Sequence, residues 1–450
     1  MNSGNRPISG LDIEGLDRRS FLARTGLAIG AGILSPSIPV AFTRAIANQQ
    51  GPLSWSDIRA QFNLDPGLIH MACFYLVSHP GPVREAIEKH RKGLDNNPFE
   101  AEFWNSDKFE LDVRTAAAQH LGVNADNIAL TDSTTMGLGL LYGGLTLREG
   151  EEILSTTHDH YSTEMSLKHR AARTGASYRQ VPLYQKPEST TVDEIVGSIV
   201  KNIRPNTRIV AVTWVHSGTG VKIPLKQMSE AIAKINTGRS EETRIIFCVD
   251  GVHGLGVEDV TMEDLGCDFF VAGCHKWIFG PRGTGIVYGR PTAWPVANRI
   301  IPTFDGQAYE QWMGLVPVAT RPPGPVMSPG GFHSFEHRWA LADAFRYHMG
   351  IGKARIAQRV HELNRRLKEG LASIKHVKLH TPMSDDLSAG IVCFEVEGMD
   401  PIDVVKNLRT KNIVATVTPY KTLYDRLAPS IVNTPEQVDA TVKAVEGLKG

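Results

Sequence analysis

Cysteine, net charge and long apolar runs are all scarce in this chain of 450 residues. Five cysteines and no CxxC pair argue against a disulfide framework and against a structural zinc site. Lysine plus arginine and aspartate plus glutamate both total 48, and this zero net charge argues against a broad nucleic-acid-binding surface. No run is long and apolar enough for a convincing membrane span, so none is expected in the mature protein. The cysteines are Cys73, Cys248, Cys267, Cys274 and Cys393.

Nucleotide and metal signatures are also weak or absent. Gly218-Thr219-Gly220 lacks the third glycine of a dinucleotide fingerprint, and no segment matches a P-loop. His333 and His337 have the spacing of a helical zinc pair, but Glu336 is misplaced for an HExxH site. We therefore expect no metal, although His158 and His160 remain candidate ligands that lack an evident third partner.

The N-terminus has the pattern of an export signal. Residues 17–22 read Asp-Arg-Arg-Ser-Phe-Leu, an apolar glycine-bearing run covers 26–42, and residues 45–47 form a small-x-small cleavage site. The alternative is a chance arginine pair before an amphipathic helix, but three ordered features coincide. We expect residues 1–47 to be a twin-arginine signal peptide and the mature protein to be periplasmic.

Strand and helix patterns alternate from about residue 82, which predicts an α/β fold with a mainly parallel sheet. A Pro/Gly-rich stretch at 321–331 interrupts the alternation, and a long helical region then a strand–strand–helix pattern predict a smaller α+β domain. The predicted organisation is an N-terminal arm at 48–80, a large domain at 81–334 and a small C-terminal domain at 335–450. Strands are expected at 128–131, 152–155, 177–182, 208–213, 244–249, 268–272, 284–288, 377–380 and 390–396; helices at 134–147, 163–173, 192–200, 225–235, 335–371 and 401–409.

Two of these strands end in residues that carry chemistry. The strand at 244–249 runs into Asp250, and the strand at 268–272 leads to His275 and Lys276. Ligands of open α/β sheets bind beyond the carboxyl ends of the strands, so an acid and a lysine there can meet across a crevice. Pyridoxal-5′-phosphate (PLP) requires both: a lysine amine that forms a Schiff base, and a carboxylate that keeps the pyridinium nitrogen protonated. A buried salt bridge between Asp250 and Lys276 would explain the pair equally well if it stood alone.

Two further strand ends favour the cofactor interpretation. Ser133 and Thr134 follow a strand and open a helix, where hydroxyls and free N–H groups form an anion site for a phosphate. Simple N-capping is the alternative, and the same donors can serve both purposes. His160 follows another strand end, where its ring could stack on the pyridine face.

Taken together, these motifs resemble the class V aminotransferase family of fold-type I PLP enzymes, from about residue 72 to the C-terminus. The family includes cysteine desulfurases and isopenicillin N epimerase-like proteins. The resemblance implies a large domain with a mainly parallel mixed sheet, a smaller α+β domain and a homodimer. It also implies roles for nine residues: Lys276 as the Schiff-base lysine and catalytic base, Asp250 on the pyridinium nitrogen, His160 on the ring face, Ser133, Thr134 and His275 at the phosphate, His253 near the ring hydroxyl, Ser217 facing the cofactor, and Arg426 on the substrate carboxylate.

Two positions depart from the family pattern. Gly273 stands three residues before the lysine, where the family often has serine or threonine. The stretch at 330–334 lacks the Gly-Thr pair by which a partner subunit commonly reaches the phosphate, so His333 or Ser334 could replace that contact. The loop at 321–334 remains the expected partner loop.

The expected activity is PLP chemistry at the α-carbon of an amino acid or amino-acid-derived substrate, of the aminotransferase type. Epimerisation and C–S elimination share the first half of that reaction, and an inactive binding protein is a further alternative. The export signal together with the fold resembles the periplasmic PLP enzymes that tailor the siderophore pyoverdine. The 414–425 stretch before Arg426 contains no cysteine, which predicts that the chain is not a cysteine desulfurase.

Overall fold

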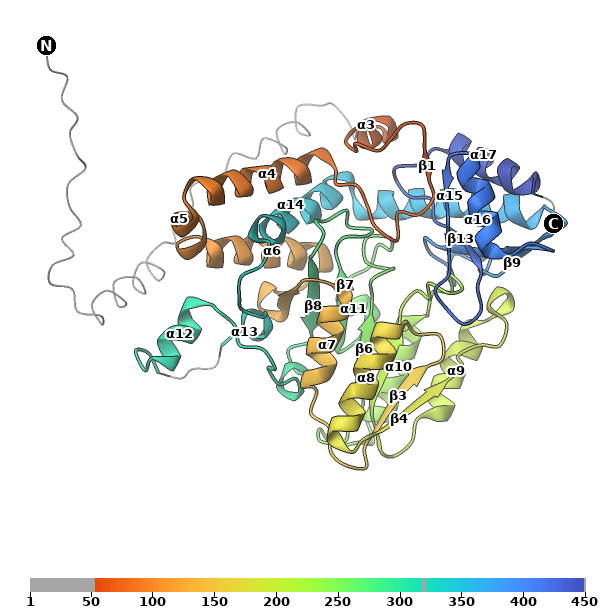
Figure 1. Ribbon diagram of the computed structural model, residues 1–450. Coiled ribbons are helices and arrows are strands. Elements are labelled where there is room, and N and C mark those ends of the chain that lie inside the picture. The colour runs from red at the N-terminus through yellow and green to blue at the C-terminus, as the bar shows by residue number, and fades with distance from the viewer. Residues whose placement is uncertain (1–52, 318–320, 449–450) are drawn as a thin grey trace, which may run out of the picture.

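A seven-stranded sheet forms the centre of the computed structural model, which describes residues 53–317 and 321–448 (Figure 1). The strand order is β2-β8-β7-β6-β5-β3-β4. β8 runs antiparallel to both of its neighbours and the remaining pairs are parallel. The predicted mainly parallel, mixed sheet is therefore confirmed. Its strands are β2 (Ile128–Thr131), β3 (Glu152–Thr156), β4 (Ser177–Val181), β5 (Thr207–Thr213), β6 (Ile246–Asp250), β7 (Phe269–Gly273) and β8 (Gly285–Gly289).

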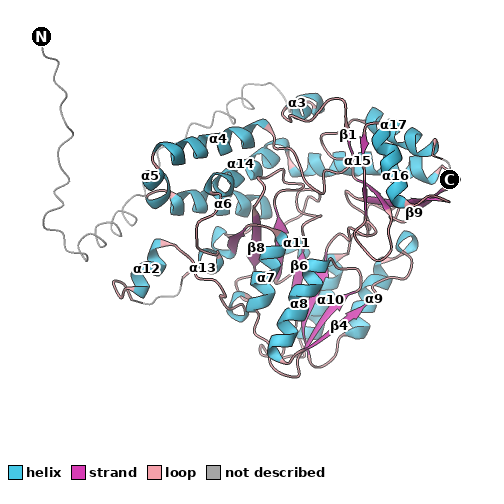
Figure 2. Ribbon diagram, in the orientation of Figure 1, coloured by secondary structure: helices cyan, strands magenta, loops and turns pink. Residues whose placement is uncertain are grey.

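Alternate residues of these strands face two different cores, as the two-residue period of a strand requires. On β5, Val210 and Val212 belong to the larger core, whereas Ile209 and Ala211 belong to the smaller one. Helices cover both faces, which explains why the central strands are apolar throughout (Figure 2). The smaller core is shared with α7 (Thr134–Gly144) and α8 (Tyr161–Thr174); the larger core takes in α6 (Ser106–Leu121), α9 (Val192–Asn202) and α10 (Leu225–Asn236).

The predicted helix at 134–147 ends earlier, at Gly144. A side chain there would meet the Asn298 carbonyl, since an added Cβ would lie 2.1 Å from that oxygen. The chain instead leaves the helix, and Leu145 forms a bridge with Ala297. Close approach of a second segment, which a local pattern does not reveal, decides this end.

The predicted helical region at 335–371 consists of two helices, α14 (Phe335–Ile351) and α15 (Lys353–Ala372). They are separated by Gly352, whose φ of 100° suits glycine rather than a residue with a side chain. α14 packs against α4 (Gly81–Asn96) and α6, whereas α15 packs against α17 (Pro435–Glu446) (Figure 1). The chain thus passes from one packing unit to the next at Gly352, and the predicted division at residue 335 remains a prediction.

A second sheet, of order β12-β13-β10-β9, forms the C-terminal unit. Its core includes buried residues of α15, α16 (Pro401–Thr410) and α17. The N-terminal arm contains the short helix α3 (Trp55–Ala60), and its strand β1 (Ile69–His70) pairs in parallel with β11 (Ile413–Val414). The strands are β9 (Val377–Leu379), β10 (Val392–Val396), β12 (Thr416–Val417) and β13 (Asp425–Leu427).

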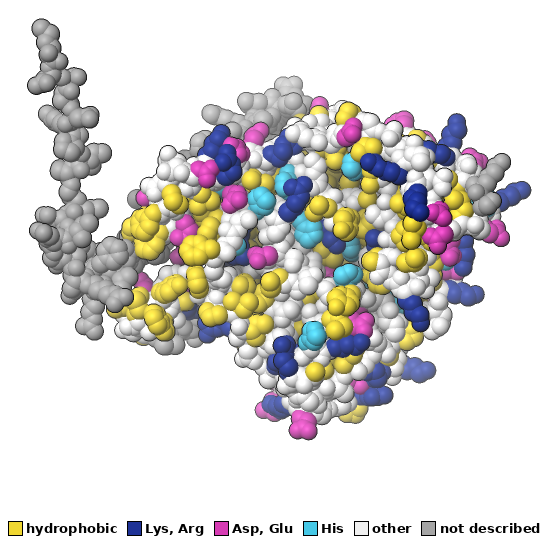
Figure 3. Space-filling view, viewed as in Figure 1, with side chains coloured by type: hydrophobic (Ala, Val, Ile, Leu, Met, Phe, Trp, Pro, Cys, Tyr) yellow, Lys and Arg dark blue, Asp and Glu magenta, His cyan; other side chains and the backbone are white. Residues whose placement is uncertain are grey.

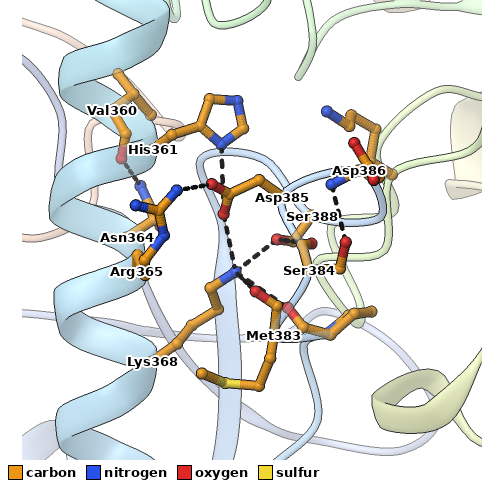
Figure 4. Close-up of polar contacts among 12 residues, drawn as sticks. Val360, His361, Asn364, Arg365, Lys368, Met383, Ser384, Asp385, Asp386 and Ser388 are labelled. Atoms are coloured by element: carbon orange, nitrogen blue, oxygen red, sulfur yellow. Dashed lines mark hydrogen bonds and ion pairs between the residues drawn. The ribbon is translucent and has the colours of Figure 1, made fainter.

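A buried lysine on α15 fastens the 382–388 loop to the C-terminal unit (Figure 4). Lys368 donates to the Pro382 carbonyl at 3.1 Å, the Met383 carbonyl at 2.9 Å and Ser388 Oγ at 2.6 Å. Its Nζ lies 3.6 Å from Asp385 Oδ1. Burial lowers the pKa of Lys368 to about 8, and Asp385 opposes that shift.

None of the helices in the described part of the chain is long and apolar enough to cross a membrane.

Candidate active site

Asp250 is the last residue of β6 and is almost completely buried. Thr163 Oγ1 donates to its Oδ2 at 3.2 Å, and the Val252 amide donates to its Oδ1 at 3.2 Å. Burial raises the pKa of Asp250 to about 6, whereas the Val252 bond and the nearby Lys276 act to lower it. A cationic N–H group beside this carboxyl would therefore be held strongly, because it would stabilise a charge that burial makes costly.

Lys276 lies three residues beyond β7, with its Nζ 3.3 Å from Nε2 of His253. Burial lowers the pKa of Lys276 to about 8, against the attraction of Asp250, and Arg426 adds to the lowering. His253 is neutral because burial first, and then Lys276, hold its pKa well below the usual value. Its Nδ1 is buried without a protein partner within the described residues, as expected of a group that faces a bound polar ligand.

His160 is held in place by the helix that it caps. It is the N-cap of α8, and its Nδ1 accepts the Ser162 amide at 3.3 Å and lies 2.7 Å from Ser162 Oγ. The preceding residue, Asp159, accepts the Thr213 amide at 2.7 Å and so ties this turn to the end of β5. The ring of His160 is thereby brought to the same sheet edge as Lys276 and Arg426. Burial is the main cause of the lowered pKa of His160, and the positive charges of Lys276 and Arg426 lower it further.

The expected phosphate loop divides its two hydroxyls between two tasks. Ser133 is the N-cap of α7 and accepts the Met136 amide at 3.1 Å. Thr134 Oγ1 accepts the Gly273 amide at 2.8 Å, which locks the start of α7 to the end of β7. A Cβ on Gly273 would lie 2.9 Å from both Thr134 Oγ1 and His275 Cε1. The departure at Gly273 is thus explained, since Thr134 and His275 occupy the space where a serine or threonine side chain would begin.

Arg426 projects from β13 toward the large domain and is 5% exposed. Its Nε donates to Thr416 Oγ1 at 3.0 Å, its Nη1 to the Ser217 carbonyl at 2.9 Å and its Nη2 to the Val417 carbonyl at 3.2 Å. A guanidinium has five N–H groups, so one remains on each Nη. Two N–H groups are the number that a carboxylate can accept with its two oxygens. Among the described residues, no acidic side chain forms an ion pair with Arg426, which leaves its charge available to a ligand.

Several contacting residues were not anticipated from the sequence. Phe74 of the arm lies 4.3 Å from the Arg426 guanidinium carbon, in cation–π geometry, and 5.9 Å from the His253 ring. Thr163 bonds Asp250, and the Tyr420 hydroxyl lies 2.7 Å from Ser217 Oγ. Only Thr163 had a sequence signal, because it lies in the first turn of a helix that follows the His160 motif.

The metal alternatives gain no support from the geometry. Across residues 53–317 and 321–448, no group of three or more His, Cys, Asp or Glu is placed to hold an ion. His158 stacks on Tyr184 at 3.9 Å and its Nε2 accepts the Leu183 amide. His337 Nδ1 lies 3.0 Å from the Arg282 carbonyl. Both histidines therefore have structural partners.

The residues gathered at this sheet edge fit PLP. A buried amine with a pKa near 8, a buried carboxyl and a histidine with an orphaned ring nitrogen supply the groups that the cofactor requires. The N-terminus of α7 supplies free amides for a phosphate. These features define the chain as a PLP enzyme of fold type I.

Comparison with known proteins identifies the family. The model of the family described as "Aminotransferase class-V" matches residues 102–418, which is more than half of the chain. The chain therefore belongs to the class V aminotransferase family, whose members use PLP, and the resemblance inferred from its motifs is confirmed.

Curated relatives and solved structures point the same way. Isopenicillin N epimerase of Streptomyces clavuligerus is 25% identical over 409 residues, covering 88% of this chain and 98% of that protein. A probable cysteine desulfurase of Halalkalibacterium halodurans is 27% identical, covering 72% of this chain and 78% of that protein. A C-DES variant with glycine covalently linked to its PLP cofactor superposes with a TM-score of 0.78 at 20% identity, over 87% of this chain and 99% of that one. Apo cysteine desulfurase from Thermococcus onnurineus NA1 superposes with a TM-score of 0.72 at 22% identity, over 87% of this chain and 97% of that one.

Proposed function

We propose that this enzyme acts at the α-carbon of an amino acid or of the amino-acid end of a larger molecule, by amino transfer. The observation that carries the proposal is the guanidinium of Arg426, which keeps one N–H on each Nη for a carboxylate and lies in the same cluster as Lys276. A substrate held there by its carboxylate presents its α-carbon to the cofactor site.

The chain's own residues supply binding, charge and proton transfer. Bound PLP supplies an electron sink that weakens bonds at the α-carbon. Asp250 holds positive charge on the ring nitrogen, because a buried carboxylate is stabilised by a cation beside it. Lys276 moves the α-proton, and its lowered pKa places a useful fraction of free amine near neutral pH. His253, kept neutral by burial, accepts from or donates to Lys276 at 3.3 Å.

The deciding experiment incubates the holoenzyme with single amino acids and a keto acid acceptor, and analyses the products. Amino transfer yields a new amino acid and a new keto acid in equal amounts. Racemised substrate without keto acid would instead identify an epimerase, and pyruvate with a sulfur product would identify a C–S lyase. A protein without any PLP absorption band in the visible region would be the inactive binding protein.

Epimerisation is the second candidate, and the similarity to isopenicillin N epimerase favours it. That likeness extends over nearly the whole of both chains. An epimerase exchanges the α-proton of either enantiomer with solvent. Mass spectrometry of D- and L-substrates recovered from deuterated buffer tests this directly: deuterium in both, with no keto acid, selects epimerisation over amino transfer.

A cysteine desulfurase is the activity that we do not propose, although several relatives carry that name. All five cysteines are buried. Burial raises the pKa of Cys274 beyond its usual range and that of Cys393 to about 12, so neither thiol is ready to act as a thiolate. Release of sulfide from L-cysteine at a rate comparable to other amino acids, abolished by Cys274→Ser or Cys393→Ser, would overturn this.

We further propose a homodimer and a periplasmic location, with tailoring of a siderophore of the pyoverdine type as the cellular role. Exposed apolar side chains support the dimer: Trp312 on α12 (Gly306–Trp312) is 82% exposed and Phe332 in the expected partner loop is 83% exposed. The location rests on the twin-arginine pattern, which lies outside the described residues. Replacing Arg18-Arg19 with Lys-Lys is expected to retain the protein in the cytoplasm, and unchanged export would contradict the signal.

A further inference from the structure

Tyr420 connects the C-terminal unit to the loop that orients Arg426. It lies between β12 and β13, in the stretch where a desulfurase would carry its cysteine. The Tyr420 hydroxyl is 2.7 Å from Ser217 Oγ. Its ring lies so close to Gly218 that an added Cβ there would be 3.0 Å from Tyr420 Cδ2. The ring also meets His160 edge-to-face, with centroids 6.4 Å apart. Tyr420 therefore closes over the 217–218 backbone on the side that faces the site.

The backbone that Tyr420 holds is the backbone that Arg426 uses. The Ser217 carbonyl accepts Arg426 Nη1 at 2.9 Å. The same loop is anchored elsewhere by Tyr184, whose hydroxyl lies 2.9 Å from His216 Nδ1 and 2.7 Å from Thr219 Oγ1. With the loop fixed on both flanks of Ser217, the position of its carbonyl decides which N–H of Nη1 is occupied and which one remains for a ligand.

We propose that Tyr420 is a positioning residue for Arg426: by bonding Ser217, it fixes the carbonyl that aligns the guanidinium for the substrate carboxylate. The inference rests on the proposed function, since it requires a carboxylate at Arg426. Loss of the Tyr420 hydroxyl then weakens the binding of ligands that carry a carboxylate and leaves the binding of matched ligands without a carboxylate unchanged. A purely structural role for the tyrosine would affect both kinds of ligand equally.

The test compares two probes that differ only at the carboxyl group, L-alanine and L-alaninamide. Each is titrated into the PLP-loaded enzyme, and the dissociation constant is read from the change in cofactor absorption. Arg426→Gln is expected to abolish the preference for alanine. Tyr420→Phe is expected to weaken the binding of alanine roughly 3- to 10-fold, the range for one hydrogen bond, and to leave the binding of alaninamide unchanged. Ser217→Ala removes the same hydrogen bond and should weaken the binding of alanine by a similar factor. The double variant should match the single ones, because both remove the same bond.

Tyr424→Phe is the matched control, because it removes a hydroxyl from the same loop. The Tyr424 ring stacks on the His380 ring, with centroids 3.9 Å apart, and the variant should bind both probes as the parent does. Equal weakening of alanine and alaninamide in Tyr420→Phe would overturn the inference, as would unchanged binding of alanine. If Arg426→Gln kept the full preference for alanine, the carboxylate site of the proposed function would itself be wrong.

Discussion

At the scale of single residues, the site depends on burial that would be costly without a ligand. Asp250 and Lys276 are both shifted toward their neutral forms, and Arg426 has no acidic partner among the described residues. Groups arranged in this way gain most when an opposite charge or a hydrogen-bond partner arrives, which is the behaviour expected of a cofactor and substrate site.

Asp250→Asn is expected to leave PLP bound and to lower turnover by roughly 100-fold or more, the range for loss of one active-site electrostatic group. A neutral amide cannot hold the proton on the ring nitrogen, whereas its oxygen still accepts the Val252 amide. Steady-state rates with the best substrate measure the loss. Thr163→Val removes one hydrogen bond to Asp250 but keeps its carboxylate, and should lower turnover by no more than roughly 10-fold. Near-normal turnover in the asparagine variant would remove Asp250 from this role.

Asp425→Asn is expected to flatten part of the pH dependence of stability. Both carboxyl oxygens of Asp425 are buried without a partner within the described residues, and burial, Asp400 and Glu395 raise its pKa to about 8. The folded state thus binds a proton that the unfolded chain releases near pH ~4, so this group's contribution to stability falls as pH rises from about 4 to about 8. As the pH rises through that window, the free energy of unfolding of the variant should increase relative to that of the parent by up to about 1.4 kcal/mol per pH unit. Urea unfolding at pH 6, 7 and 8 measures this difference. The same dependence of stability on pH in the parent and in the variant would contradict the raised pKa of Asp425.

At the scale of elements, α15 ties the C-terminal unit together through its buried face. Lys368 holds the 382–388 loop, and the Leu387 carbonyl in that loop accepts the Lys222 amide at 2.8 Å. The loop is thereby connected to the large domain. Part of the alignment of the two domains around the site thus depends on contacts that involve no catalytic residue.

Lys368→Met is expected to destabilise the protein by about 3 kcal/mol, because it removes hydrogen bonds and leaves buried acceptors unpaired. Thermal unfolding of the PLP-loaded protein measures this. Lys406→Met is the control, since Lys406 forms an exposed i,i+3 pair with Asp403, and almost no change is expected there. Equal melting temperatures for the two variants would show that the 382–388 loop does not depend on Lys368.

At the scale of the whole molecule, one face exposes several large apolar side chains, which supports the proposed homodimer. Figure 3 shows hydrophobic side chains gathered at the left, over α5 (Pro98–Phe103) and α12. A cavity of about 400 Å³ lies beside them and includes the end of the expected partner loop in its lining. The large exposed residues of this face are Phe99, Phe103, Phe304, Tyr309, Trp312 and Phe332.

The double variant Trp312→Ser/Phe332→Ser is therefore expected to shift the protein from dimer to monomer, because it removes two of the most exposed apolar side chains of this face. Light scattering should give half the parent's mass at micromolar concentration. Ile402→Ser, an exposed apolar site on α16, should remain dimeric. A parent protein that is monomeric and fully active would refute the homodimer.

The sequence by itself determined the strands of the main sheet and the residues at their ends. Apolar runs such as 128–131 and 208–213 fix strands locally, and the topology of a parallel sheet then places Asp250, Lys276 and His160 at one edge. Some element ends were instead decided by contacts with distant segments: α7 ends at Gly144, where the Asn298 carbonyl approaches the helix closely. Tertiary structure alone supplied Phe74 against Arg426 and Tyr420 against Ser217. Those contacts join segments more than 200 residues apart, and no local pattern of hydrophobicity, charge or spacing records which distant side chain will fill a given space.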